Sequence, residues 1–154
     1  MSRVDNNEPG GAGAEARHLH VPPDEPGFWV SPSNLERLGR VAQRSQAGEC
    51  VNAIIRGPKG CGKTTLARVF AARWARPFYE VHCGAFVDVE QWFGKDRLTA
   101  GETWYRKARF IYAVETPFCV VLLDEINRAH PEVLNAILGL LDWRRSMWSD
   151  DLTY

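Results

Sequence analysis

The stretch GPKGCGKTT, at residues 57–65, constrains the fold of this chain more than any other feature of the sequence. Its Gly57, Gly62, Lys63 and Thr64 follow the G-x4-G-K-T spacing of a phosphate-binding loop. Glycines let successive backbone N–H groups point inward, and the start of the following helix adds free N–H groups and partial positive charge. Such a loop lies between a strand and a helix, so the motif predicts a strand–loop–helix unit.

Each position of this loop has a predicted role. Lys63 is expected to reach the terminal phosphates of a nucleotide, and the Thr64 hydroxyl is expected to bind Mg²⁺. Lys59 could add positive potential at the phosphates, but a solvated loop lysine is the favoured interpretation. The Cys61 thiol is a candidate for modification beside the nucleotide. The predicted nucleotide-binding residues are Gly57, Pro58, Lys59, Gly60, Cys61, Gly62, Lys63, Thr64 and Thr65.

Strand patterns alternate with helix patterns along the rest of the chain. Short apolar runs rich in β-branched residues predict strands, and apolar residues spaced three and four apart predict amphipathic helices. This alternation is typical of an α/β fold with a parallel sheet flanked by helices. The strands are predicted at 50–57, 77–84 and 117–124, and the helices within 33–47, 63–76 and 130–143.

Two acids end the third predicted strand, in the sequence VVLLDE. Ligands of open parallel sheets bind beyond the carboxyl ends of the strands. Asp124 could hold Mg²⁺ through its water shell, and Glu125 could orient and deprotonate an attacking water as a catalytic base. The alternative is that both acids cap the following helix. Because the chain also contains a phosphate loop, the metal and base roles are favoured.

Composition limits the class of protein without naming a partner. The 154 residues suit one domain, and 19 basic residues balance 19 acidic ones, so nucleic acid and anionic membranes are not indicated as partners. The four cysteines contain no C-x-x-C pair, which favours reduced thiols and a cytoplasmic protein. No apolar run is long enough to span a bilayer, and no signal peptide is recognisable. Residues 1–27, with four Pro and four Gly, are expected to form a flexible tail before a domain at 28–154.

The segments GPKGCGKTTLAR and VVLLDEINRAHPEVLNAILGLLD together resemble the AAA+ ATPases, nearest to the MoxR-like and dynein-related branch. This resemblance implies ATP and Mg²⁺ as ligands, with Thr64 and Asp124 at the metal and Glu125 as the catalytic base. It also implies a homo-oligomeric ring that remodels a protein partner. Two alternatives stay open: a nucleotide-binding regulator without hydrolysis, and a GTP-using motor of a restriction-type system.

The same resemblance raises three weaker hypotheses. Residues 91–110 occupy the place of a loop that faces the central pore of such rings, although packing at the sheet edge is the favoured role for the aromatic residues in it, which are Trp92, Phe93, Trp104 and Tyr105. His82 or Cys83 could hold Glu125 away from water. Arg128 could reach a neighbouring nucleotide, but pairing with local acids is favoured.

The AAA+ architecture also has a fourth strand between the first and the third, followed by an arginine finger and a small helical lid. No counterpart of these parts is recognisable in the sequence. We therefore expect a P-loop fold truncated before the fourth strand, with low stability and little turnover in this form. Its first and third strands should either pair directly or leave a gap.

Overall fold

The computed structural model describes residues 19–99, 102–142 and 144–147. Helix α2 (Pro32–Gln46) confirms the helix predicted within 33–47. At its start, Ser31 Oγ accepts a hydrogen bond from the Asn34 amide, and Pro32 occupies the first helical position. Most of the flexible tail predicted for 1–27 falls outside the described residues. Within residues 19–27, the His20 carbonyl accepts a hydrogen bond from the Phe78 amide and so contacts the start of the sheet.

Helix α3 (Lys63–Arg73) follows the phosphate loop and ends earlier than its apolar pattern predicts. Ala75 adopts a left-handed conformation, with φ of 49°. The Ala75 amide bonds to the Ala72 carbonyl, and the Arg76 amide bonds to the Ala71 carbonyl. These two bonds are the hydrogen-bond pattern of a Schellman motif, which closes a helix by satisfying its last carbonyls. The helix therefore ends before the proline that was expected to stop it.

The sheet is a parallel pair of strands, β1 (Phe78–His82) and β4 (Val120–Asp124). Its register places Phe78 opposite Val120, and His82 opposite Asp124 at the carboxyl end. The crossover between the strands contains η1 (Cys83–Ala85), α4 (Glu90–Phe93), β2 (Gly94–Thr99), β3 (Glu102–Lys107) and α5 (Arg109–Glu115). After β4 come η2 (Ile126–Arg128) and α6 (Pro131–Leu141). The strands predicted at 77–84 and 117–124 and the helix predicted within 130–143 are thus confirmed.

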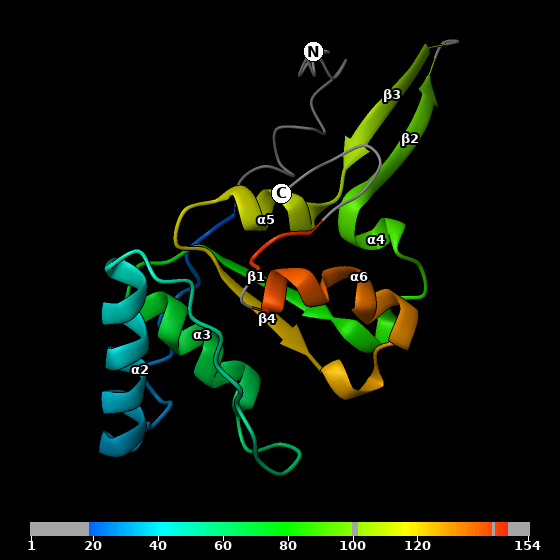
Figure 1. Cartoon of the computed structure of the whole chain (residues 1–154). Coiled ribbons are helices and arrows are strands. Elements are labelled where there is room, and N and C mark those ends of the chain that lie inside the picture. Colours follow the sequence, from blue (N-terminus) through cyan, green and yellow to red (C-terminus); the bar gives the residue numbers. More distant parts are fainter. Residues whose placement is uncertain (1–18, 100–101, 143, 148–154) are drawn as a thin grey trace.

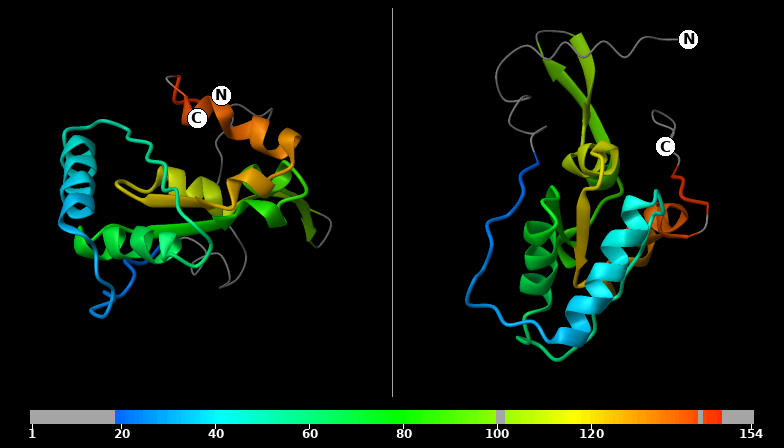
Figure 2. Two further views of the ribbon diagram at one scale, coloured as in Figure 1. Left: turned by 90° about the horizontal axis from the view of Figure 1, so that it is seen from below. Right: turned by 90° about the vertical axis from the view of Figure 1, so that its left-hand side faces the viewer.

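Helices cover both faces of this strand pair, so the architecture is the predicted α/β type (Figures 1 and 2). Helix α3 lies on one face and α6 on the other. Every residue of β4 is nevertheless partly exposed, although its apolar sequence predicts a strand that is covered on both faces. The reason is that β4 pairs with β1 along one edge, and no other described strand lies along its second edge. No described helix is long and apolar enough to span a bilayer.

The main core lies between the strands and the helices α4, α5 and α6. Trp92 is fully buried, and its ring packs 4.7 Å from the Phe110 ring between centroids. The Trp92 indole N–H donates to the Val133 carbonyl at 2.8 Å, which satisfies the buried donor and links α4 to α6. The other members of this cluster include Val81, Cys83, Phe93, Ile111, Ile137 and Met147.

The strand predicted at 50–57 is not formed. Residues 49–58 are irregular, and within the described chain this segment contacts the end of α6: Asn52 Nδ2 donates to the Leu141 carbonyl, and Arg145 donates to the Cys50 carbonyl. Its β-branched composition favours a strand, but a strand also needs a neighbour that accepts and donates backbone hydrogen bonds. Of the two predicted outcomes, direct pairing with the third strand or a gap, the described chain shows no pairing.

No hairpin is predicted from the sequence at 94–107, yet β2 and β3 form an antiparallel pair there. The hairpin projects away from the strand pair (Figure 1). Gly94 starts it with a φ of 132°, and a Cβ atom at this position would lie 2.2 Å from the Arg106 carbonyl oxygen. Only glycine fits such a close approach of two backbones. The segment is rich in charged residues, which explains why apolar periodicity gave no signal.

Candidate functional site

The phosphate loop connects the irregular segment to α3 and has the backbone that its glycines predict. Gly60 and Gly62 have positive φ values of 78° and 81°. A Cβ atom on Gly62 would lie 2.7 Å from the Phe28 ring, and one on Gly57 would lie 2.7 Å from Cys61 Sγ. The loop therefore needs glycine for its backbone conformation at Gly60 and Gly62, and for lack of space at Gly57 and Gly62.

The start of α3 offers free hydrogen-bond donors at this loop. Gly62 is the residue before the helix, and no described side chain caps it. The backbone amides of the first helical turn, from Lys63 to Thr65, therefore have no acceptor within the helix. The Lys63 ammonium group bonds to the carbonyls of Gly57 and Pro58, at 3.1 Å and 2.7 Å. Its charge thus lies directly over the loop, where an anion would approach.

The structure brings the predicted metal-binding residues together across sixty positions of sequence. Thr64 Oγ1 donates to Asp124 Oδ2 at 2.9 Å. The second oxygen of Asp124 accepts from the Glu125 amide at 2.9 Å, which fixes the orientation of the carboxylate. A hydroxyl and a carboxylate oxygen are hard donors of the kind that Mg²⁺ takes in phosphate sites, so these two residues could hold that ion.

Glu125, the predicted base, has an unusual backbone conformation for a side chain of its size. Its φ is 51°, in the left-handed region, where a residue with a Cβ atom is disfavoured by about 1 kcal/mol. The Arg128 amide bonds to the Glu125 carbonyl at 2.8 Å, and this short turn holds the conformation. The Glu125 carboxylate pairs with the Arg128 guanidinium at 3.2 Å. The favoured hypothesis for Arg128, pairing with a local acid, is therefore confirmed.

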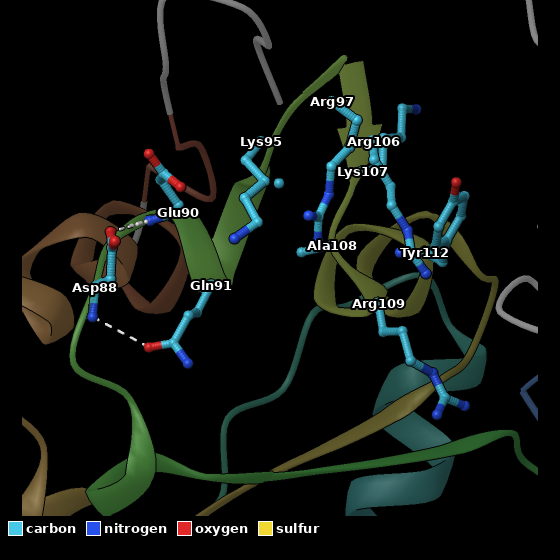
Figure 3. Close-up of a pocket in the computed structure, with 11 residues that line it drawn as sticks. Asp88, Glu90, Gln91, Lys95, Arg97, Arg106, Lys107, Ala108, Arg109 and Tyr112 are labelled. Carbon is cyan, nitrogen blue, oxygen red and sulfur yellow. Dashed lines mark hydrogen bonds between the residues drawn. The ribbon is translucent and has the colours of Figure 1, made fainter. Parts of the chain in front are cut away.

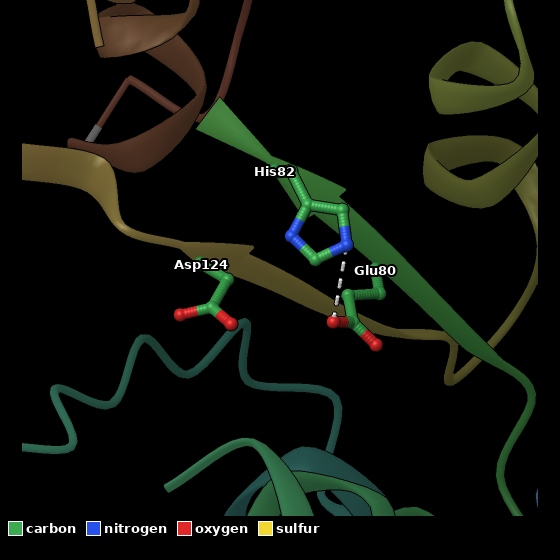
Figure 4. Close-up of side chains that lie close together, drawn as sticks. All are labelled: Glu80, His82 and Asp124. Carbon is green, nitrogen blue, oxygen red and sulfur yellow. Dashed lines mark ion pairs between the residues drawn. The ribbon is translucent and has the colours of Figure 1, made fainter. Parts of the chain in front are cut away.

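His82 does not contact Glu125 in this structure. Its imidazole lies 3.5 Å from the Glu80 carboxylate instead, as Figure 4 shows. Glu80, His82 and Asp124 present ligand atoms within 4.8 Å of one another, so they form a group of possible metal ligands. Glu80, however, already forms a 2.7 Å ion pair with Arg68 on α3. The negative charge of Glu80 is thereby balanced without an ion.

Cys83, the other residue considered as a partner of Glu125, points into the core and is fully buried. Burial, together with the nearby Asp124 carboxylate, raises the pKa of the Cys83 thiol to about 11. The thiol is therefore protonated at neutral pH, which makes it neither a nucleophile nor a metal ligand. Gly84 follows it, and a Cβ atom there would lie 3.2 Å from the Arg128 side chain and 3.9 Å from the Glu125 carboxylate.

A cavity of about 580 Å³ opens beside the phosphate loop. It is large enough for the base and sugar of a nucleotide. One wall comes from the segment before α2 and from α2 itself, and the other comes from residues 53–56 and the start of α3. The lining is mainly apolar, with Arg37, Arg56 and Lys63 as its cations. The sequence motifs give no indication of this cavity, because its walls lie outside the loop and are joined only by folding.

The aromatic residues proposed as pore-facing have different positions. Trp92 and Phe93 are buried in the core, so a role in gripping a polypeptide is wrong for both. The packing alternative is correct for them, since they join α4 to the neighbouring helices. Tyr105 lies on strand β3 of the hairpin, while the side chain of Trp104 lies outside the described part of the structure.

Comparison with known proteins identifies the family of this chain. Residues 52–153, more than half of the chain, match the model of the AAA domain of the dynein-related subfamily. The chain belongs to this AAA family. The match contains both the phosphate loop and the acidic pair, so the predicted resemblance to the dynein-related branch is confirmed.

Curated relatives are similar over a large part of the chain. The protein named "Putative chaperone BssE" from Thauera aromatica is 37% identical over 135 residues, which are 87% of this chain and 47% of that protein. An uncharacterised protein of Staphylococcus saprophyticus is 31% identical over 62% of this chain and 38% of its own length. The uncharacterised protein YojN of Bacillus subtilis is 30% identical over 62% of this chain and 33% of its own length. The chain thus spans less than half the length of these relatives.

Proposed function

We propose that this chain binds ATP with Mg²⁺ and that the full-length protein hydrolyses ATP to remodel a protein partner, as a MoxR-like AAA+ ATPase. The observation that carries the proposal is the 2.9 Å hydrogen bond from the Thr64 hydroxyl to the Asp124 carboxylate. It joins the hydroxyl of a phosphate loop to an acid at the carboxyl end of a strand. These are the two protein oxygens that a magnesium–nucleotide site of this class needs.

The residues around this bond support nucleotide binding. Backbone amides of the loop and of the first turn of α3 can donate to phosphate oxygens, and Lys63 can exchange its carbonyl acceptors for a terminal phosphate. The apolar walls of the adjacent cavity can cover a purine base. When bound, Mg²⁺ neutralises charge on the phosphates, and Thr64 and Asp124 would hold it.

Hydrolysis is proposed to depend on Glu125. Its carboxylate would accept a proton from the attacking water, which requires that it leave the Arg128 guanidinium. The ion pair is solvent-exposed, so its loss costs little free energy. While the pair persists, the base is occupied, and this favours binding before turnover. That arrangement also supports the second candidate, a nucleotide-binding regulator that does not hydrolyse.

Remodelling of a protein partner, assembly into a homo-oligomeric ring and a cytoplasmic location are parts of the same proposal. Membership of the AAA family supports ring assembly, and the chaperone name of the relative from Thauera aromatica supports a protein as partner. Ring assembly predicts that hydrolysis per chain rises with protein concentration, because neighbouring subunits would complete each site. Hydrolysis that is independent of concentration would contradict it.

Isothermal titration calorimetry with Mg-ATP tests the binding step, on material whose helix content is verified by circular dichroism. We expect Lys63→Ala to weaken binding by roughly 10- to 100-fold, since a charge-assisted contact to phosphate is lost. Lys95→Ala is the matched control, because it removes an equal charge from the distant hairpin and should leave the affinity unchanged. Equal affinities of Lys63→Ala and the unmodified chain would refute the proposal.

Two further measurements separate the candidates. Steady-state phosphate release that Glu125→Gln abolishes, with Mg-ATP affinity retained, supports the ATPase. In the full-length protein, tight binding of Mg-ATP without phosphate release, even at high protein concentration, supports the regulator. Titration with Mg-GTP in parallel decides the base preference, and tighter binding of GTP than of ATP would favour the GTP-using motor.

A further inference from the structure

A second pocket, of about 230 Å³, lies at the base of the β2–β3 hairpin, between the hairpin, α4 and α5 (Figure 3). The hairpin and the phosphate loop lie at opposite ends of the molecule (Figures 1 and 2). The pocket therefore belongs to a different surface from the proposed nucleotide site. Five of its lining residues are cations, and two are acids.

The strand register aligns three of these cations on one face of the hairpin. Lys95 is directly opposite Arg106 in the antiparallel pair, and Arg97 is two residues farther along β2, on the same face as Lys95. Like charges at directly opposed positions destabilise a strand pair. No local packing requirement explains three cations here, since all three side chains are exposed.

Within the described residues, these three cations are not neutralised. The side chains of Lys95, Arg97 and Arg106 form neither a hydrogen bond nor an ion pair with another described residue. The two remaining cations of the pocket differ in this respect. Lys107 forms a 2.7 Å ion pair with Glu115, and the Arg109 guanidinium lies 5.9 Å from the centre of the Tyr79 ring. A bound anion would therefore reduce the electrostatic repulsion among these three cations.

We infer that this basic pocket, defined by Lys95, Arg97 and Arg106, binds an acidic segment of a protein partner. Two guanidinium groups and one ammonium group can each bind a carboxylate, and guanidinium groups do so with two parallel hydrogen bonds. The inference extends the proposed function, because it gives the chemistry by which a remodelled protein would be recognised. It does not require that the chain hydrolyse ATP.

The surroundings of the pocket favour a short acidic peptide over nucleic acid. Asp88 and Glu90 line the same pocket and would repel a continuous chain of phosphates. The chain as a whole carries no net charge, with 19 basic and 19 acidic residues, so no long-range field would attract a polyanion. An acidic peptide can place separate carboxylates on the three cations and avoid the two acids.

Fluorescence anisotropy with a fluorescein-labelled peptide of about ten residues, in which Glu alternates with Ser, tests this inference at low salt, where such contacts are strongest. The full chain is compared with the triple variant Lys95→Gln/Arg97→Gln/Arg106→Gln. Its matched control is Arg40→Gln/Arg44→Gln/Arg73→Gln, which removes the same charge from exposed positions on α2 and α3 outside the nucleotide cavity. We expect the hairpin variant to weaken peptide binding about ten-fold or more, and the control less than about two-fold.

Absence of peptide binding to the full chain, or equal losses in the two variants, would overturn the inference. Tighter binding of a single-stranded oligonucleotide with the same number of charges, lost in the hairpin variant, would overturn it in favour of nucleic acid. Mg-ATP titrations on the same samples keep the two proposals apart. Peptide binding can fail while Lys63-dependent nucleotide binding persists, and the reverse outcome would leave the pocket supported without the nucleotide site.

Discussion

The phosphate loop and the aromatic core around Trp92 are built on opposite principles. The loop, Gly57–Thr65, uses glycines, an uncapped helix start and a partly exposed lysine, and the amides at the start of α3 have no acceptor within the helix. In the core around Trp92 the large side chains are buried or half-buried, and the indole N–H is bonded to the Val133 carbonyl. The loop thus keeps donors that a bound ligand can use, while the polar and apolar groups of the core already have partners within the chain.

This difference shows that the residues that stabilise the fold and the residues of the candidate site lie in separate parts of the chain. Buried apolar area supplies most of the folding free energy, and it is concentrated between the strands and α4, α5 and α6. The candidate site adds strain at Glu125 and unpaired donors at α3, both of which reduce stability. Substitutions in the two regions should therefore have separable effects, in folding for the core and in binding or turnover for the site.

The largest expected effect is on folding, from Trp92→Ala. Removing this fully buried ring should lower the free energy of unfolding by about 3–5 kcal/mol, through a cavity and the loss of the hydrogen bond to the Val133 carbonyl. Urea denaturation followed by circular dichroism measures it. Trp29→Ala is the control, because that ring is 78% exposed, and its loss should change stability by less than about 0.5 kcal/mol. Equal midpoints for the two variants would refute the assignment of the core.

A smaller effect on stability is expected at Glu125, where replacement by glycine should relieve backbone strain. Because φ is 51°, Glu125→Gly should be more stable than Glu125→Ala by about 1 kcal/mol, although glycine normally destabilises folded chains. Both variants lose the carboxylate, so both should fail to release phosphate. Urea midpoints and phosphate release are measured on the same samples. A less stable glycine variant would show that the backbone at this position is not strained.

The smallest effect concerns the thiols and involves no change in folding. Burial raises the pKa of Cys83 and Cys119 to about 11, so both are protonated at neutral pH and should react with N-ethylmaleimide only as the pH approaches that value. Cys50 and Cys61 are exposed and should react readily. Mass spectrometry of labelled peptides should also show that Mg-ATP protects Cys61 and leaves Cys50 unprotected. Rapid labelling of Cys83 in folded protein would contradict its burial.

The chemistry of the candidate site could be predicted from local sequence, because it depends on residue types at fixed spacings. Glycines at 57, 60 and 62 determine which backbone conformations the loop can adopt, and the VVLLDE run places an acid at the end of a strand. The helix starts at Lys63 and Pro131 follow in the same way, from the loop motif in the first case and from proline at the first helical position in the second.

Tertiary structure alone decided the remaining features, since they depend on which partners lie nearby. The apolar segment at 50–57 has the composition of a strand but lacks a backbone partner within the described chain, and so remains irregular. The aromatic pair Trp92 and Phe93 could serve binding or packing, and only burial against α5 and α6 resolved the choice. The basic pocket arises from strand register, which joins Lys95 to Arg106 through long-range hydrogen bonds that no local pattern specifies.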